Sequence, residues 1–267
     1  MSLIATRGLS FHAQRLGSRG RPPLVMLHGL LIGTLASWYF TAAPALAEER
    51  EILLYDLRGH GRSARVTSGY DVATMAADLD AMAATLGPGP VDLAGHSFGA
   101  LVALRFTLDH PERVRRLALV EAPLPPSQLR ELDQLTGRSP DELVASLPEG
   151  LRAAVAEGGR RARRFVDSIR FLTTETTLLG DLGKEPDVAD AELGRLACPV
   201  LCVYGDRSSC RSVGERLARV VPTARLVVLP GGHFLHLDAT ASLTRELVAF
   251  FDAPSDGGPA PAAGRHG

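Results

Sequence analysis

Six short apolar runs, each containing or followed by glycine, proline or aspartate, most constrain what this chain can fold into. Runs of this length, rich in valine, leucine and isoleucine without clean polar alternation, are typical of strands buried on both faces. They therefore predict a parallel sheet that is covered by helices on both sides. The runs are LVMLHG (24–29), EILLYDLRG (51–59), VDLAGHS (91–97), VRRLALVEA (114–122), PVLCVYGD (199–206) and ARLVVLPGGH (224–233).

Helical patterns separate these runs. In residues 71–86 the apolar side chains recur at three- and four-residue spacing, and Gly87-Pro88 should end that helix. Residues 100–108 and 243–251 have the same character. Alternation of strand and helix predicts an α/β fold with right-handed crossovers.

One stretch lacks any convincing strand run. Residues 123–196 contain segments with helical spacing, such as 129–135 and 162–171, and we interpret them as a helical cap inserted between two strands. The expected core is then 1–122 together with 197–251. The Pro-, Gly- and Ala-rich tail, 252–267, is expected to be disordered.

Composition excludes several classes of protein. The 267 residues are 45% hydrophobic, which is enough for one domain with a full core. A net charge of −1 gives no electrostatic footprint for nucleic acid. No apolar stretch approaches the roughly 20 residues that cross a bilayer, and the N-terminal segment does not resemble a secretory signal. We expect a cytoplasmic protein that binds neither nucleic acid nor membrane.

The cysteines suggest no special chemistry. Cys198, Cys202 and Cys210 are odd in number and lack a metal-type spacing with paired histidines. No disulfide framework is implied, which fits a reducing cytoplasm. We expect neither a metal site nor a cofactor.

The strongest chemical signal is Gly95-His96-Ser97-Phe98-Gly99, a G-x-S-x-G run between a predicted strand and a predicted helix. A serine on such a tight turn projects its hydroxyl from the carboxyl end of the strand, and flanking glycines avoid clashes there. The helix N-terminus beside it favours developing negative charge. Ser97 is therefore the candidate nucleophile.

A serine hydroxyl is a weak nucleophile and needs a base and an orienting carboxylate. His233, directly after the last strand run, is the candidate base, and we expect the nearby His236 to be structural. Asp206, at the end of PVLCVYGD, is the favoured acid. Glu121 ends the strand after the Ser97 turn and is the less favoured alternative.

An oxyanion that forms at Ser97 needs two hydrogen-bond donors. One should be the backbone N–H of Phe98, the residue after the nucleophile. The other should come from the loop after the first strong strand, where we choose the N–H of Leu30.

These motifs resemble the α/β-hydrolase superfamily, and in particular its capped, esterase-like branch. The resemblance covers roughly residues 10–251 and implies an eight-stranded, mostly parallel sheet, a helical cap and a Ser-His-Asp triad in the chain order Ser97, Asp206, His233. Many members have two glycines where this chain has Gly99-Ala100. The motifs that carry the resemblance are HGLL (28–31), DLRGHGRS (56–63), GHSFGA (95–100), VYGD (203–206) and GGHFLHL (231–237).

The resemblance also narrows the reaction. Dehalogenases and epoxide hydrolases of this architecture are similar but have aspartate where this chain has Ser97. We therefore expect a serine hydrolase that cleaves an ester or thioester of a small, largely apolar acyl substrate through an acyl-enzyme. GHSFGA and GGHF are also similar to stand-alone thioesterases, although DLRGHGRS is not.

Two alternatives remain open. One is a thioesterase or cyclase that releases a polyketide or peptide chain from an acyl carrier protein, with the basic run GGRRARR (158–164) as its docking site. The other is a ligand-binding protein of the same fold that does not catalyse. Apolar side chains of the cap that could line an acyl pocket are Leu143, Leu147, Phe165, Phe171, Leu172 and Leu178.

Overall fold

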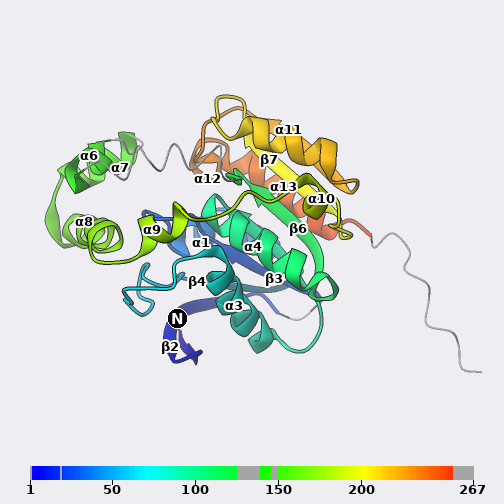
Figure 1. The fold of residues 1–267 in the computed structure, drawn as a ribbon, viewed down its shortest axis with the longest axis horizontal. Coiled ribbons are helices and arrows are strands. Elements are labelled where there is room, and N and C mark those ends of the chain that lie inside the picture. The colour runs from blue at the N-terminus through cyan, green and yellow to red at the C-terminus, as the bar shows by residue number, and fades with distance from the viewer. Residues whose placement is uncertain (1, 19, 125–138, 146–148, 255–267) are drawn as a thin grey trace, which may run out of the picture.

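The computed structural model describes residues 2–18, 20–124, 139–145 and 149–254. The described strands form one eight-stranded sheet with the order β1-β2-β4-β3-β5-β6-β7-β8 (Figure 1). β3 to β8 are parallel, and β1 and β2 are antiparallel to their neighbours at one edge. The expected α/β-hydrolase sheet is thus confirmed. The strands are β1 (Ser2–Thr6), β2 (Leu9–Leu16), β3 (Arg21–Leu27), β4 (Arg50–Tyr55), β5 (Val91–His96), β6 (Val114–Val120), β7 (Val200–Gly205) and β8 (Ala224–Leu229).

Each of the six apolar runs overlaps one of the parallel strands, although β3 and β4 begin before their runs. The alternation of side chains along the strands explains the composition of the runs. Val25 and Leu27 of β3 point into one hydrophobic layer, whereas Leu24 and Met26 point into the other, and all four are buried. A central strand with helices on both faces has no polar side, because successive side chains enter opposite cores.

Two sets of helices close these layers. α3 (Val72–Ala83), α4 (Phe98–Asp109) and α11 (Arg211–Val220) supply the first, and α3 and α4 lie in front of the strands in Figure 1. α1 (Ala36–Tyr39), α2 (Ala43–Leu46) and α13 (Thr240–Asp252) supply the second. The three helices expected from spacing are therefore present as α3, α4 and α13.

The N-terminal strands β1 and β2 were not evident as apolar runs. β1 has no buried residue and β2 is buried only at residues 11–13, because the two strands form the edge of the sheet and are only partly covered. A half-exposed edge strand has a weaker hydrophobic signal than a strand buried on both faces.

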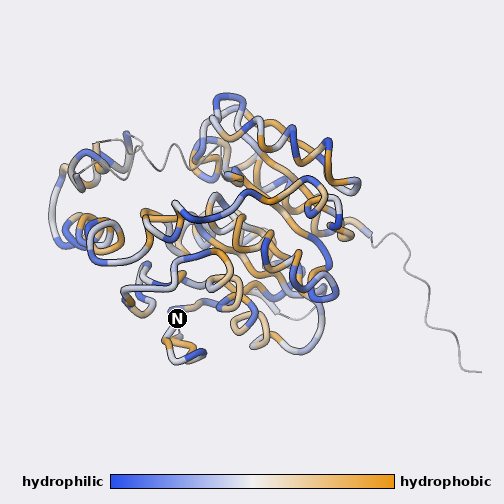
Figure 2. The backbone as a smooth tube through the Cα atoms, viewed as in Figure 1, coloured by the Kyte–Doolittle hydropathy of each residue, from blue (hydrophilic) through white to orange (hydrophobic). Residues whose placement is uncertain are grey.

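Between β6 and β7, the described residues form helices and no strand. Figure 2 shows α8 with both hydrophilic and hydrophobic sides, as expected for a helix that packs on one face only. The expected helix over 129–135 lies outside the described residues. No helix in the described chain is both long and apolar enough to cross a membrane. The helices are α6 (Pro140–Ala145), α7 (Glu149–Ala156), α8 (Gly159–Thr174), α9 (Leu178–Leu182) and α10 (Asp190–Leu193).

The C-terminal part of this helical segment packs against the hydrophobic core of the sheet domain. Phe171, Leu172 and Leu178 are buried in the same hydrophobic layer as α3 and α4. Three of the apolar side chains expected to line an acyl pocket therefore pack the segment onto the sheet domain. Phe165 is only partly buried, and Leu143 and Leu147 fall outside the side chains that the structure describes.

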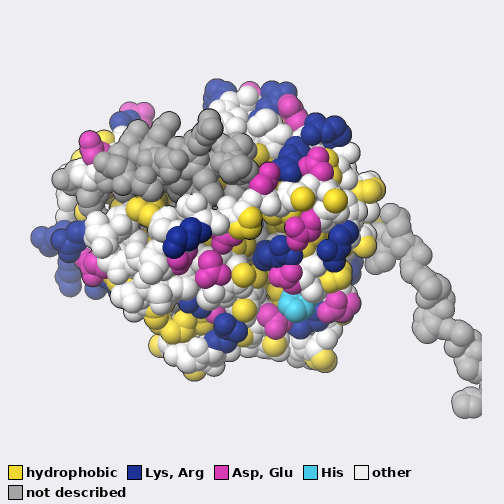
Figure 3. All heavy atoms as spheres, in the orientation of Figure 1, with side chains coloured by type: hydrophobic (Ala, Val, Ile, Leu, Met, Phe, Trp, Pro, Cys, Tyr) yellow, Lys and Arg dark blue, Asp and Glu magenta, His cyan; other side chains and the backbone are white. Residues whose placement is uncertain are grey.

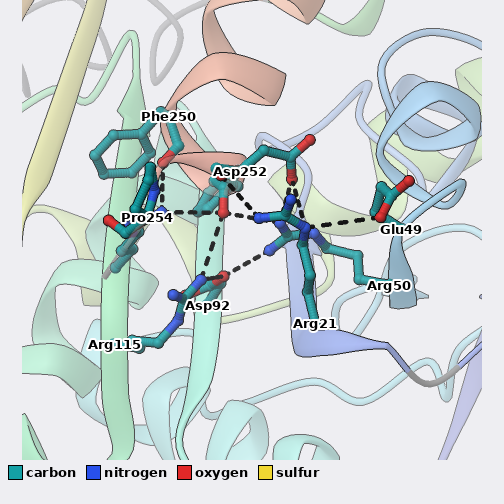
Figure 4. A network of polar contacts seen from close by, with 10 residues as sticks. Arg21, Glu49, Arg50, Asp92, Arg115, Phe250, Asp252 and Pro254 are labelled. Atoms are coloured by element: carbon teal, nitrogen blue, oxygen red, sulfur yellow. Dashed lines mark hydrogen bonds and ion pairs between the residues drawn. The ribbon is translucent and has the colours of Figure 1, made fainter. Parts of the chain in front are cut away.

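A buried charge network joins the amino ends of the central strands to the end of α13 (Figure 4). Arg50 Nη1 lies 2.7 Å from Asp92 Oδ2, with both side chains fully buried, and Arg115 Nη2 lies 2.6 Å from the same oxygen. Arg50 also donates to the carbonyl of Phe251 at 2.8 Å and pairs with Asp252. Removing one partner from such a buried pair typically costs about 3–5 kcal/mol.

The first residues of the expected disordered tail, 252–254, are held by contacts to the core. Asp252 is the last residue of α13 and pairs with Arg50, while the carbonyl of Pro254 accepts a hydrogen bond from Arg116 at 2.9 Å (Figure 4). These contacts hold the first residues beyond the apolar part of the helix. Residues 255–267 lie outside the described chain.

Candidate active site

Ser97 lies on the turn between β5 and α4. Its backbone has φ +53° and ψ −122°, a conformation that residues with a side chain rarely adopt and that is a mark of functional turns. The turn is tight, since a Cβ on Gly95 would lie only 2.4 Å from the carbonyl oxygen of Gly99. It also lies close to the end of β3, since a Cβ on Gly99 would lie 2.4 Å from the carbonyl oxygen of His28. The predicted strand–serine–helix turn is present, and it leaves Ser97 partly exposed.

His233 lies on the loop after β8 and reaches Ser97 from the far edge of the sheet. Its Nε2 is 2.9 Å from Ser97 Oγ. The carbonyl of His233 accepts a hydrogen bond from His96 Nε2 at 2.8 Å, which holds the loop against the Ser97 turn. The structure therefore brings together two residues that are 136 positions apart in the sequence.

The carboxylate behind His233 belongs to Glu121. Glu121 directly follows β6, its side chain is fully buried, and its Oε2 lies 3.2 Å from His233 Nδ1. Gly205 N–H donates to Oε1 at 2.5 Å, and the Ser208 hydroxyl donates to Oε2. A carboxylate at Nδ1 keeps the proton on that nitrogen and leaves Nε2 to accept the proton of Ser97.

The favoured sequence choice for the acid, Asp206, is not placed against His233. Asp206 Oδ1 instead accepts a hydrogen bond from Gly231 N–H at 2.9 Å, and its side chain is 46% exposed. The bond ties the end of β7 to the loop that carries His233. On geometry, Asp206 supports the loop and the alternative residue, Glu121, takes the position of the orienting carboxylate.

The backbone of Glu121 explains this difference. Both carboxylates directly follow neighbouring parallel strands, so both lie at the carboxyl ends of the strands. Glu121 has φ +55°, an uncommon conformation for a residue with a side chain. Its position after the strand next to β5 was a visible signal in the sequence, but its unusual backbone angle was not.

The loop expected to supply the second oxyanion donor lies against the nucleophile. A Cβ on Gly29 would approach Ser97 Cβ to 3.2 Å, so only glycine leaves ordinary space there. Leu30 is the next residue of the loop that approaches Ser97. Phe98 is the first residue of α4, where backbone N–H groups have no carbonyl partner within the helix. This arrangement is compatible with Leu30 and Phe98 as donors.

Two buried histidines fix that loop. His28 Nε2 accepts from Leu57 N–H at 2.9 Å, and His60 Nε2 accepts from Leu31 N–H at 3.0 Å. Burial lowers the pKa of His60 to about 3, and it also lowers the pKa of His28. Both rings are therefore neutral near pH 7 and can accept these bonds.

His236 behaves as a packing residue. Its ring lies 4.7 Å from the ring of His96, and burial lowers its pKa to about 4. The ring of His236 is buried, whereas the imidazole of His233 is 31% exposed beside Ser97. The placement agrees with the expected structural role of His236.

One cluster of potential metal ligands occurs among the described residues. Glu121, Cys210 and His233 each offer a ligand atom, and these atoms lie within 4.8 Å of one another. Cys210 precedes α11, and its Sγ is 3.9 Å from His233 Nδ1. No sequence motif points to Cys210, because it is far from Glu121 along the chain.

Comparison with known proteins gives consistent matches. The family model for the alpha/beta hydrolase fold matches residues 22–157. A protein named as a carbamate hydrolase from Variovorax paradoxus is 30% identical over 241 residues, which are 85% of this chain and 90% of that protein. A hydrolase structure from Pseudomonas aeruginosa has a TM-score of 0.77 at 25% identity and covers 94% of this chain and 98% of its own.

A further relative is longer than this chain. The acetyltransferase component of the acetoin cleaving system from Pseudomonas putida is 28% identical over 251 residues. The match covers 88% of this chain but only 65% of that relative's length.

Proposed function

Because this chain belongs to the α/β-hydrolase family, we propose that it is a serine hydrolase that cleaves an ester or thioester bond through an acyl-enzyme. The observation that carries the proposal is the 2.9 Å contact between Ser97 Oγ and His233 Nε2, with Glu121 behind the imidazole. Acyl transfer by a serine requires a base that is hydrogen-bonded to the serine and a carboxylate that is hydrogen-bonded to the base.

The chemistry follows from these contacts. Ser97 Oγ attacks the carbonyl carbon while its proton passes to His233 Nε2, and the backbone N–H groups of Leu30 and Phe98 bind the resulting oxyanion. His233 then gives the proton to the departing alcohol or thiol, which leaves Ser97 acylated. Water, deprotonated by the same imidazole, releases the acid. Glu121 keeps Nδ1 protonated and stabilises the imidazolium in both halves of the reaction.

Apolar side chains beside the nucleophile favour an apolar acyl group. Leu30 lies on the loop next to Ser97 and remains partly exposed. Phe234 is also partly exposed, and its ring centroid lies 5.6 Å from that of His233. A cytoplasmic location is part of the proposal, since none of the three cysteines is disulfide-bonded.

A fluorophosphonate should label this protein at a single site. The activated Ser97 hydroxyl attacks phosphorus, so intact mass should show one adduct and peptide mapping should place it on Ser97. The Ser97→Ala protein, treated identically, is the control and should stay unlabelled. A panel of ester and thioester substrates of graded acyl length then identifies the preferred bond and chain. An unlabelled wild-type protein would instead indicate the binding protein without catalysis.

The exposed arginines of α8 favour carrier-bound thioesters as a second candidate. Arg160, Arg163 and Arg164 are exposed, and dark blue side chains gather at the end of the molecule where α8 lies (Figure 3). An acyl carrier protein with an acidic surface would be attracted to such a patch.

If a carrier protein docks there, the enzyme should hydrolyse carrier-bound acyl thioester faster than the same acyl group on a small thiol at low salt. The advantage should fall as salt rises, because screening shortens the range of surface attraction to about 10 Å at 0.1 M. Arg163→Glu should remove the advantage. Arg219→Glu, at an exposed position of α11, is the matched control. Equal turnover of both substrates at every salt concentration would eliminate the carrier.

A further inference from the structure

Behind the imidazole of His233, the structure places a thiol that the proposed reaction does not use. Cys210 Sγ lies 3.9 Å from His233 Nδ1, on the same side of the ring as Glu121 Oε2 at 3.2 Å. We propose that Glu121, Cys210 and His233 form a binding site for a thiophilic divalent cation such as Zn²⁺ or Cd²⁺, and that its occupancy switches the enzyme off. Cation binding stands on geometry alone, whereas the inhibition rests on the proposed function.

The separations match the dimensions of a tetrahedral site. Zn²⁺ binds thiolate sulfur at about 2.3 Å and imidazole nitrogen or carboxylate oxygen at about 2.0–2.2 Å, which places neighbouring ligand atoms about 3.3–3.7 Å apart. The distance from Cys210 Sγ to His233 Nδ1 is 3.9 Å and that from His233 Nδ1 to Glu121 Oε2 is 3.2 Å, so the two values lie on either side of this range. All three ligand atoms lie within 4.8 Å of one another. Shifts of up to about an ångström would therefore complete three of the four positions.

The ligands are also held in place before any cation arrives. Ser208 hydrogen-bonds to Glu121 through its hydroxyl and accepts from Cys210 N–H at 3.0 Å, so one side chain links the two ligands. Glu121 is fully buried and Cys210 is 2% exposed, whereas the imidazole of His233 is 31% exposed. A carboxylate and a thiolate would balance the charge of a divalent cation in this poorly hydrated place.

The ligand types select among cations. A thiolate together with an imidazole suits Zn²⁺ and Cd²⁺, whereas Mg²⁺ and Ca²⁺ prefer oxygen ligands throughout. The hard cations should therefore have no effect at concentrations where the thiophilic ones act.

Cation binding would disable the base by changing its tautomer. The free site carries a proton on His233 Nδ1, facing Glu121, and one on the Cys210 thiol. Coordination at Nδ1 transfers that proton to Nε2, and coordination at Sγ releases the thiol proton to solvent, so one proton is released per cation. His233 Nε2 then carries a hydrogen and can no longer accept the proton of Ser97.

The test titrates the full-length wild-type protein and the Ser97→Ala variant with Cd²⁺. We expect one cation per chain and the ultraviolet charge-transfer band of a Cd²⁺–thiolate bond in both proteins, because Ser97 is not a ligand. Cys210→Ala should lose the band while its far-ultraviolet circular dichroism stays that of the wild type. Cys202→Ala is the matched control, since Cys202 is buried in β7 and burial raises the pKa of its thiol to about 12. A band that persists in Cys210→Ala, or that never forms in the wild type, overturns the site.

Inhibition is measured separately, with each variant compared with its own metal-free activity. Hydrolysis by the wild type should fall with occupancy, about a hundredfold at a Zn²⁺ concentration of one hundred Kd, and return when a chelator is added. Mg²⁺ should leave it unchanged, and Cys210→Ala should be insensitive to the same Zn²⁺ concentrations. A bound cation with undiminished hydrolysis would overturn the switch. Absence of hydrolysis in metal-free wild type would contradict the proposed function, and the spectroscopic result would still decide the cation site.

Discussion

The Ser97→Ala variant should lose kcat by a factor of about 10⁵–10⁶ while it unfolds at nearly the same temperature as the wild type. Removing the nucleophile of a serine hydrolase leaves only the oxyanion hole and substrate binding, and losses of this size are typical. Stability should change little, because alanine retains the Cβ that the strained turn already accommodates. The hydrogen bond between Ser97 and His233 contributes at most about 1 kcal/mol.

The measurement combines steady-state hydrolysis of the best ester or thioester with a thermal melt of both proteins. Ser212→Ala, an exposed position on α11, is the matched control and should keep wild-type kinetics. A Ser97→Ala protein that retained most of its activity would contradict the proposed mechanism. A variant that lost its melting transition would instead assign Ser97 a structural role.

The parts of the fold that were predictable are those where local sequence and burial agree. The apolar runs that became β3 to β7 are buried on both faces, so their composition alone marks them, whereas β8 at the other edge of the sheet is apolar but only partly buried. The Ser97 turn was predictable for a related reason, because the chain must pass from strand to helix within a few residues that glycine permits. β1 and β2 lacked this signal, since they form an edge of the sheet, are only partly buried and mix polar with apolar residues.

The candidate site was predictable only in part. Ser97 and His233 could be paired because each follows the carboxyl end of a predicted strand, and the carboxyl ends of parallel strands lie on the same side of the sheet. The same reasoning admits two carboxylates, Glu121 and Asp206, since they follow the neighbouring strands β6 and β7. What separates them is tertiary: the left-handed backbone of Glu121, and the Gly231 N–H that engages Asp206. Neither can be seen in a pattern of residue types.

Cys210 illustrates the same limit. Its spacing from the other cysteines suggests nothing, and the contact with His233 arises because the loop after β7 contacts the loop after β8. Ligand clusters assembled from three separate strand ends leave no local motif.

The two candidates for the acid, Glu121 and Asp206, can be distinguished by one pair of substitutions. Glu121→Gln should reduce kcat by about 10⁴-fold, the loss expected when an amide replaces the carboxylate that sets the tautomer of the catalytic histidine. Asp206→Asn should reduce it by less than about tenfold, because the asparagine oxygen can still accept from Gly231 N–H. Both variants should be measured for hydrolysis and for the rate of fluorophosphonate labelling, which reports nucleophile activation without product release.

Stability must be followed in the same samples, because Glu121 accepts hydrogen bonds from both Gly205 and Ser208. Glutamine can satisfy only one of these donors through its oxygen, so we expect a loss of about 1–3 kcal/mol in the free energy of unfolding. Asp206→Asn decides the assignment even if Glu121→Gln folds poorly. A loss near 10⁴-fold in Asp206→Asn would return the acid to the residue that the sequence favours, and near wild-type activity would leave Glu121 as the carboxylate behind His233.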